Sequence, residues 1–269
     1  MIRDITFGQY YNVKSPIHSL DPRTKLNATL IYLVSIFFCD SYFSYFLALV
    51  FLTMSIRLSN VPFRFVFKGI KSLLLLLFLS VFFNLFLTDG VPLVSLFNIT
   101  ITYEGLNLAI KMACRLCFLI LFSSLLSLTT TPKKLTDGME EQFKFLSIFK
   151  VPVADIALMM SISLRFVPIL VEEVDKIMKA QTSRGARFDD KNLIKRVKSY
   201  VPLLVPIFVS AFRRANDLSL AMEARCYNDS DKRTKLNPLK YGINDAVCYL
   251  ILVIYVIIIL LVKNYYKGF

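Results

Sequence analysis

The chain has 269 residues, of which 56% are hydrophobic and 19% are charged, whereas a soluble domain has about 45–50% apolar and about 25% charged residues. The mean hydropathy of +0.58 and the length of the apolar blocks favour a lipid bilayer over water as the solvent of the chain. The net charge of +13 does not indicate a nucleic-acid partner, because basic residues on the cytoplasmic side of a membrane protein set its orientation.

Apolar stretches predict about five membrane spans. In chain order they cover residues 26–39, 42–56, 66–87, 105–128 and 246–262. The first two belong to one run that would be about 46 Å long as a single helix, which exceeds a hydrocarbon core of about 30 Å. Asp40 and Ser41 divide this run near its middle, so a hairpin of two short spans is expected.

Charges in the connecting segments orient these spans. Residues 57–71 carry four bases and no acid, and residues 88–104 carry two acids and no base, which places the first segment in the cytoplasm and the second outside. The basic N-terminal segment also favours the cytoplasm. A hairpin over 26–56 satisfies all three segments, so we expect a multi-pass protein of the cytoplasmic membrane.

The region 129–245 contains two more apolar stretches, 151–171 and 201–212, and hydropathy alone would allow the first to be a span. If both crossed the membrane, the link over 172–200 would face outwards with eight bases against five acids. Such a loop contradicts the positive-inside bias. We therefore place 129–245 on the cytoplasmic side, as long helices lying on or against the membrane.

The predicted fold is thus an all-α integral membrane protein in three parts. The parts are an N-terminal membrane region with about four spans (1–128), a cytoplasmic region of long helices (129–245), and a last transmembrane helix with a tail (246–269).

Three helices are expected in the cytoplasmic region, over 132–149, 153–184 and 189–225. Thr131 is typical of a helix N-cap, and Pro168 predicts a kink in the second helix. Gly185 predicts the end of the second helix. The carboxylates of Asp189 and Asp190 suit the positive end of the third helix.

The residue types that carry most enzyme chemistry are missing or isolated. None of the eight glycines forms a GxxxxGK[ST] or GxGxxG phosphate loop, and His18 is the only histidine, which excludes HExxH zinc sites and Ser–His–Asp catalysis. Cys114 and Cys117 have CxxC spacing without a second pair, so apolar packing suits them better than zinc or redox chemistry. Acidic groups at 172–175 and 228–231 lack the second carboxylate motif of membrane prenyl- or phosphotransferases. We expect a chain that is not an enzyme and holds no metal or cofactor.

Lys111 and Arg115 lie four residues apart on one face of a predicted span. A charge near the middle of a membrane costs about 3 kcal/mol on insertion scales, so such a pair is a candidate for function. Alternatively, both side chains reach the outer headgroups or pair with Asp89 or Glu104. The sequence leaves both interpretations open.

Arg184 and Arg225 each stand at the predicted end of a long helix, in the segments AQTSRGAR and AMEARCYN. Basic side chains in a last turn complement the helix dipole, which is worth about 0.3–1 kcal/mol. Two such endings in one cytoplasmic region favour docking instead, because a guanidinium offers a rigid fork to carboxylates of a partner.

Four segments carry a resemblance to a known family. They are SPIHSLDPRTKL (15–26), LRFVP (164–168), AQTSRG (180–185) and AMEARCY (221–227). In this order they resemble the transmembrane coupling (T) component, the EcfT family, of energy-coupling factor (ECF) transporters. The resemblance runs from about residue 15 to the last span.

The resemblance implies that two triplets, Ser183-Arg184-Gly185 and Ala224-Arg225-Cys226, end two coupling helices that cross each other. Each arginine would enter a groove on one of two ABC-type ATPase subunits. Cys226 departs from the glycine that is usual in the family, and Asn228 would be an alternative residue for the left-handed helix stop.

The resemblance also implies a function and partners. ATP would be bound by the two ATPase subunits, and their closure would move the coupling helices and reorient a separate substrate-binding (S) component in the lipid bilayer, which releases its vitamin. One alternative is a T component dedicated to cobalt, nickel or biotin. Another is a membrane-embedded lipid-modifying enzyme, which needs a clustered acidic metal site that the spans do not offer. Substrate specificity would belong to another chain.

Overall fold

The computed structural model describes residues 10–96, 99–186, 188, 192–227 and 237–267, and it confirms the all-α class. The chain forms two units, Gly8–Val153 with Leu239–Phe269, and Ala154–Pro238. The first unit contains α1 (Pro16–Ser19), α2 (Pro22–Phe37), α3 (Tyr42–Ser59), α4 (Phe63–Leu87), β1 (Pro92–Leu96), β2 (Ile99–Thr102), α5 (Tyr103–Thr129), α6 (Pro132–Phe143), a 3-10 helix (Lys144–Phe149) and α9 (Ile243–Lys267). The second contains α7 (Val153–Ser183) and α8 (Leu193–Ala224).

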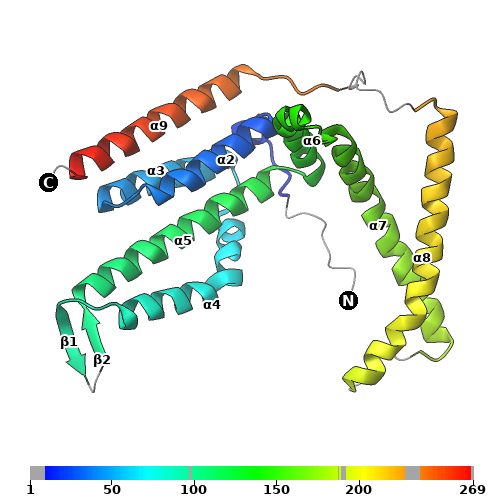
Figure 1. Ribbon diagram of the computed structural model, residues 1–269, viewed down its shortest axis with the longest axis horizontal. Coiled ribbons are helices and arrows are strands. Elements are labelled where there is room, and N and C mark those ends of the chain that lie inside the picture. Colours follow the sequence, from blue (N-terminus) through cyan, green and yellow to red (C-terminus); the bar gives the residue numbers. More distant parts are fainter. Residues whose placement is uncertain (1–9, 97–98, 187, 189–191, 228–236, 268–269) are drawn as a thin grey trace. The chain divides into compact units, whose positions relative to one another are not determined.

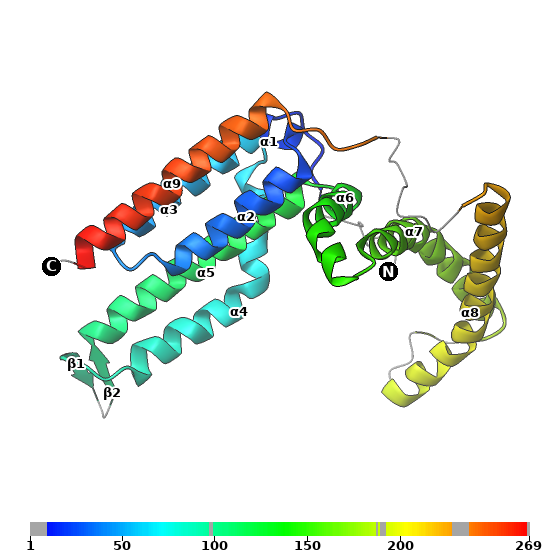
Figure 2. The same cartoon turned by 45° about the horizontal axis from the view of Figure 1, so that its top comes forward.

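The long apolar run over 26–56 is a helical hairpin, as Asp40 and Ser41 predicted. The turn between α2 and α3 falls at these residues, and the Ser41 hydroxyl accepts a hydrogen bond from the backbone N–H of Phe43, which caps α3. Helices α5 and α9 cover the predicted spans 105–128 and 246–262. Figures 1 and 2 show α2, α3, α5 and α9 side by side.

Helix α4 corrects the expectation of one straight span over 66–87. It is bent by 60° between its first part, Phe63–Lys71, and its second part, Leu73–Leu87, and the bend is visible in Figure 1. The first part carries three basic residues, whereas the second carries no charge. The second part alone is about 22 Å long, so a bend keeps the charged turns out of the apolar layer that the second part enters.

The core of the first unit is a stack of aromatic rings contributed by four helices. The ring of Tyr32 lies 4.0 Å from that of Phe122 and 5.6 Å from that of Phe51, and the rings of Phe51 and Tyr255 are 4.5 Å apart. The Tyr32 hydroxyl donates to the carbonyl of Ala48 at 3.1 Å, which satisfies a polar group that is fully buried. This stack joins α9 to the N-terminal hairpin.

Among the described residues, four helices are long and apolar enough to cross a membrane, and a fifth span results if the two parts of α4 are counted together. The four are α3, α5, α7 and α9. Together they identify a multi-pass membrane protein. Helix α7 qualifies by length and hydropathy, so its cytoplasmic placement stays a prediction from the charges of 172–200.

The segment expected as an external loop, 88–104, contains the antiparallel hairpin of β1 and β2. Helix α6 packs closely on α2, because a Cβ atom at Gly138 would lie 2.9 Å from the Cβ of Pro22. The side chain of Thr131 accepts a hydrogen bond from the N–H of Lys134, which confirms the predicted N-cap of α6, and the 3-10 helix completes the expected 132–149 segment.

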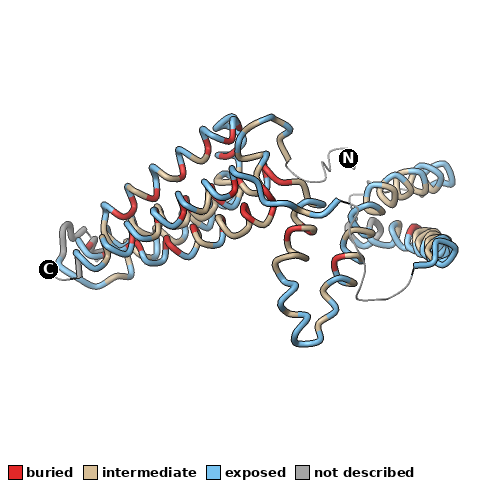
Figure 3. Tube along the Cα trace, turned by 90° about the horizontal axis from the view of Figure 1, so that it is seen from above, coloured by how far each residue is buried: buried red, intermediate tan, exposed pale blue. Residues whose placement is uncertain are grey.

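Burial separates the two units. In the first, buried residues follow the inward faces of the helices (Figure 3). Of the described side chains on α7 and α8, only Ala157 and Leu203 are buried. Met159, Phe208 and Phe212 are exposed at 63%, 61% and 72%, so both helices carry large apolar side chains that this chain leaves uncovered.

Candidate functional site

Helices α7 and α8 cross each other (Figures 1 and 2), and an ion pair joins them. A guanidinium nitrogen of Arg214 on α8 lies 2.9 Å from a carboxylate oxygen of Glu173 on α7. Both side chains are partly exposed, so the pair contributes less than about 1 kcal/mol. The Nε atom of Arg214 is buried without a hydrogen-bond partner. The carboxylate of Glu173 is therefore the main group that holds this arginine.

The C-terminal end of α7 is a Schellman motif, a helix stop closed by two backbone hydrogen bonds. The N–H of Gly185 donates to the carbonyl of Thr182 at 2.9 Å, and the N–H of Ala186 donates to the carbonyl of Gln181 at 3.0 Å. Gly185 has φ +91°, a conformation that glycine adopts without strain. The predicted stop at Gly185 is therefore confirmed, and Arg184 occupies the C-cap position just before it.

The C-terminal end of α8 repeats this geometry. The N–H of Cys226 donates to the carbonyl of Glu223 at 2.9 Å, and the N–H of Tyr227 donates to the carbonyl of Met222 at 3.0 Å. Cys226 itself has φ +55°, so it takes the left-handed position despite its side chain. Arg225 is the C-cap, in the same place as the arginine of α7.

The two arginines also lie equally far from the crossing. Arg184 follows Glu173 by eleven positions, and Arg225 follows Arg214 by eleven positions. At 1.5 Å per residue, each arm is about 16 Å long. Figure 1 shows that α7 ends below the crossing, whereas α8 runs upwards and ends above it, so the two C-terminal ends lie apart. The unit thus presents two similar cationic tips.

Both triplets at these tips are exposed. Ser183, Arg184 and Gly185 end α7, and Ala224, Arg225 and Cys226 end α8. Within the described part of the chain, neither guanidinium has a hydrogen bond or an ion pair. Backbone N–H groups already bond the carbonyls of Gln181, Thr182, Met222 and Glu223, so neither stop depends on an arginine side chain.

The start of α8 differs from the expectation. The helix begins at Leu193, and Asn192 is its N-cap, with the side-chain oxygen accepting from the N–H of Ile194 at 3.1 Å. Asp189 and Asp190, which were expected to stand there, lie outside the described residues, as does Asn228. Pro168 lies within α7 without ending it.

The segment 15–26 has a structural role that the sequence did not reveal. The buried carboxylate of Asp245, at the start of α9, accepts a hydrogen bond from the backbone N–H of Asp21 at 2.9 Å. Arg23 forms an ion pair with Asp21 at 3.1 Å and lies over the ring of Tyr241 at 4.2 Å. These contacts join the start of α2 to α9 across more than two hundred residues of sequence.

The same segment is tied to the end of α5. The buried ammonium of Lys25 donates to the carbonyls of His18 and Thr129 at 3.2 and 3.0 Å. The Nε2 of His18 lies 3.0 Å from the carbonyl of Tyr11 and its Nδ1 lies 2.7 Å from the hydroxyl of Ser15. A carbonyl only accepts, so Nε2 carries the proton. Burial lowers the pKa of His18, which favours this neutral form.

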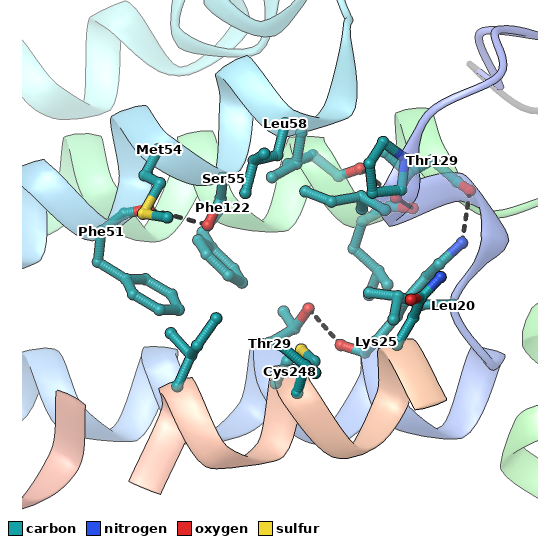
Figure 4. A pocket seen from close by; sticks show the side chains of 18 residues that line it. Leu20, Lys25, Thr29, Phe51, Met54, Ser55, Leu58, Phe122, Thr129 and Cys248 are labelled. Carbon is teal, nitrogen blue, oxygen red and sulfur yellow. Dashed lines mark hydrogen bonds between the residues drawn. The ribbon is translucent and has the colours of Figure 1, made fainter. Parts of the chain in front are cut away.

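A cavity of about 230 Å³ lies beside this segment, between α1, α2, α3, α5 and α9 (Figure 4). The hydroxyls of Thr29, Ser55 and Thr129 line it, but each already donates to a carbonyl of its own helix. The remaining wall is mostly apolar, with side chains such as Phe51 and Phe122. The cavity therefore suits hydrocarbon rather than a polar substrate.

The other sequence candidates are not brought together. In the described part of the chain, no three His, Cys, Asp or Glu side chains are placed to hold a metal ion. Cys114 and Cys117 are free thiols of intermediate burial. Glu173 belongs to the ion pair at the crossing, and the group at 228–231 lies outside the described residues.

Comparisons with known proteins agree with each other. A family model described as cobalt transport protein, CbiQ, matches residues 13–236. The chain is 46% identical over 263 residues to the energy-coupling factor transporter transmembrane protein EcfT of Ruminiclostridium cellulolyticum, which covers 98% of each chain. It is 46% identical to the protein of the same name from Clostridium kluyveri, over 94% of this chain and 96% of that one, and 41% identical to that of Streptococcus equi, over 97% of each.

Proposed function

This chain belongs to the EcfT family, the transmembrane components of energy-coupling factor transporters, and from that premise we propose that it is the coupling subunit of such a transporter. Two ATPase subunits bind the tips of α7 and α8. Movement of the ATPases on binding ATP is transmitted through the crossed helices to a separate S component in the membrane, which takes up a vitamin or another micronutrient.

One observation carries this proposal: two exposed arginines, Arg184 and Arg225, occupy the same position of the same helix stop at equal distances from the crossing. Two equal partner subunits require two equal anchors. A guanidinium at each tip offers five N–H donors in a rigid fork, which suits carboxylates in a groove. The stops keep each tip helical up to the arginine.

The uncovered apolar side chains of α7 and α8 support the presence of further partners. Exposed apolar surface of this kind in a membrane protein faces lipid or another subunit. An S component that packs on these faces moves when the helices move. The chain itself contributes no phosphate loop, so in this proposal ATP is bound by the partner subunits alone and the chain is a non-catalytic subunit without its own cofactor.

A T component dedicated to one substrate is the second candidate, because the matching family model is described as a cobalt transport protein. The two candidates differ in the S components that accompany the chain. A shared T component is expected to copurify with several different S components, whereas a dedicated T component is expected to copurify with a single kind.

Affinity purification of the full-length chain from its own membranes, followed by mass spectrometry, tests the proposal. We expect two ABC-type ATPase subunits and at least one small membrane protein in the eluate, with ATP hydrolysis that disappears when the ATPases are removed. Recovery of the chain without any ATP-binding protein, or hydrolysis that persists in the isolated chain, contradicts the proposal.

A further inference from the structure

A polar stripe on α5 faces the turn between α2 and α3. Asn107, Lys111 and Arg115 follow each other at four-residue intervals and therefore share one face of the helix. Asn107 accepts a hydrogen bond from the hydroxyl of Tyr42 at 2.5 Å, and the ammonium of Lys111 lies 5.6 Å from the centre of the same ring. The guanidinium of Arg115 lies 5.6 Å from the ring of Phe37.

A third cation reaches the same turn from α9. The ammonium of Lys263 lies 3.7 Å from the carboxylate of Asp40 and 4.7 Å from the centre of the Phe38 ring. Arg115 and Lys263 therefore lie over two consecutive rings of this turn, those of Phe37 and Phe38. Three cations thus lie over aromatic rings at the turn between α2 and α3. The carboxylate of Asp40, which pairs with Lys263, is 69% exposed.

The cluster formed by Lys111, Arg115 and Lys263 has an excess of positive charge within the described part of the chain. Lys111 and Arg115 have no carboxylate within 4.0 Å there, and Glu104, one of the predicted partners, instead accepts from the backbone N–H of Val91. One terminal nitrogen of Arg115 donates to the sulfur of Met112 at 3.9 Å, and a thioether sulfur is a weak acceptor. A guanidinium pairs most strongly with an anionic acceptor, so Arg115 has room for an anion that this part of the chain does not supply.

The short hairpin brings the cluster to the surface of the membrane. Helix α2 has 16 residues and is about 24 Å long, which is less than the hydrocarbon core of about 30 Å. Headgroups therefore descend to the turn between α2 and α3, where Phe37, Phe38 and Tyr42 are exposed. Aromatic side chains beside cations are typical of this interface.

We propose that Lys111, Arg115 and Lys263 form a binding site for the phosphate headgroup of an anionic phospholipid, in the leaflet that the turn between α2 and α3 faces. The guanidinium of Arg115 binds the phosphate through its terminal N–H groups, and the two ammonium groups neutralise the remaining charge. The exposed aromatic rings pack against the glycerol and the upper acyl chains. The site is separate from the tips of α7 and α8 and does not depend on their function.

Lipid retention by the full-length chain tests this proposal. The chain is reconstituted with phosphatidylcholine alone or mixed with phosphatidylglycerol, and the lipids retained after extraction in mild detergent are counted by native mass spectrometry. We expect Lys111→Gln combined with Arg115→Gln to lower phosphatidylglycerol retention about 30-fold, on the basis of about a factor of five per lost cation near the surface, and to leave phosphatidylcholine unchanged. Arg115→Lys keeps the charge and retains most of the binding.

The controls separate this site from other sources of binding. Lys14→Gln combined with Lys133→Gln removes two exposed cations elsewhere and is expected to leave retention unchanged. Lys263→Gln, a milder variant, is expected to lower retention even if the double variant does not fold. Equal loss in the control variant, or complete displacement of the lipid by inorganic phosphate, overturns the proposal, as does retention of phosphatidylglycerol by a folded double variant.

Discussion

The two helix stops have the same geometry but place different residues, Gly185 and Cys226, in the left-handed position. Substituting each of these residues tests the geometry of both tips. Gly185 has φ +91°, and a Cβ atom there would meet no other atom within 4 Å. The cost of Gly185→Ala is therefore almost entirely backbone strain, about 1–2 kcal/mol for an L-residue in a left-handed conformation. Cys226 already bears such strain at φ +55°, so Cys226→Gly removes it. The gain in stability is reduced by about 0.5–1 kcal/mol, because glycine has greater conformational freedom in the unfolded chain.

Hydrogen exchange followed by mass spectrometry measures this difference locally. The N–H groups of Gly185 and Ala186 are bonded within the stop of α7, and we expect peptides over 181–186 of Gly185→Ala to exchange about 5- to 30-fold faster. Peptides over 222–227 of Cys226→Gly should exchange at the same rate or more slowly. Exchange that stays within about twofold of the original chain in Gly185→Ala, or that accelerates in Cys226→Gly, refutes the proposed stops.

Three further predictions address the packing and the charges. Gly138→Ala should lower the free energy of unfolding by about 1–3 kcal/mol, because the added methyl group overlaps the first residue of α2, whereas Gly242→Ala, with its nearest contact at 3.6 Å, should change the melting temperature little. Reversing one charge of the Glu173–Arg214 pair should loosen the crossing and speed hydrogen exchange there, and reversing both should restore it; equal exchange in all three variants contradicts this. Because burial lowers the pKa of His18, the contribution of this residue to stability should be complete above about pH 6.5 and lost as the pH falls below that value. In thermal unfolding, His18→Asn should flatten the dependence of the melting temperature on pH. An unchanged pH profile would show that another group titrates.

The sequence predicted those features that depend on local patterns. The acidic break at Asp40 divided the first hairpin correctly, because a charged residue and a helix cap within one apolar run leave few alternatives. Gly185 marked the end of α7 for a similar reason. Both arginines were placed at helix ends from the residues around them. Their repeated position favoured docking, and the family resemblance specified two ATPase subunits as the partners.

Features that depend on distant residues or on averaged hydropathy were missed. The bend of α4 was hidden because Lys68 and Lys71 lie beside a strongly apolar run, and hydropathy over the whole segment does not reveal a change of direction. The role of Asp21 was also hidden, since its partner Asp245 is 224 positions away. The conformational preferences of the residues favoured Asn228 over Cys226 for the left-handed position at the end of α8. The backbone hydrogen bonds of the stop place Cys226 there instead.

The sequence located Lys111 and Arg115 as candidate residues but did not decide between their two interpretations. Lys111 and Arg115 were identified from their position in an apolar helix, but only the fold brings them to the rings of Tyr42 and Phe37 at the turn between α2 and α3. Their charge suggested function or headgroup contact without distinguishing the two. In the described part of the chain neither cation has a carboxylate within 4.0 Å, which favours an external anion.

The central claim is that Arg184 and Arg225 anchor the chain to two ATPase subunits. If each is a desolvated anchor, its loss costs about 2–5 kcal/mol at its interface, but one remaining anchor holds the complex by effective concentration. Single alanine variants are therefore expected to keep much of their ATPase partners, and the double variant to lose them. A pair of lysine replacements should rescue only in part, because an ammonium lacks the planar fork.

The most direct measurement is the amount of ATPase that copurifies with Arg184→Ala combined with Arg225→Ala, together with substrate uptake. The control, Lys179→Ala combined with Arg213→Ala, removes the same charge from exposed positions on the same helices away from their tips. The proposed coupling predicts that the double arginine variant inserts stably but retains neither the ATPases nor uptake, while the control keeps both. A stably inserted double arginine variant that still binds its ATPases and transports normally would contradict it.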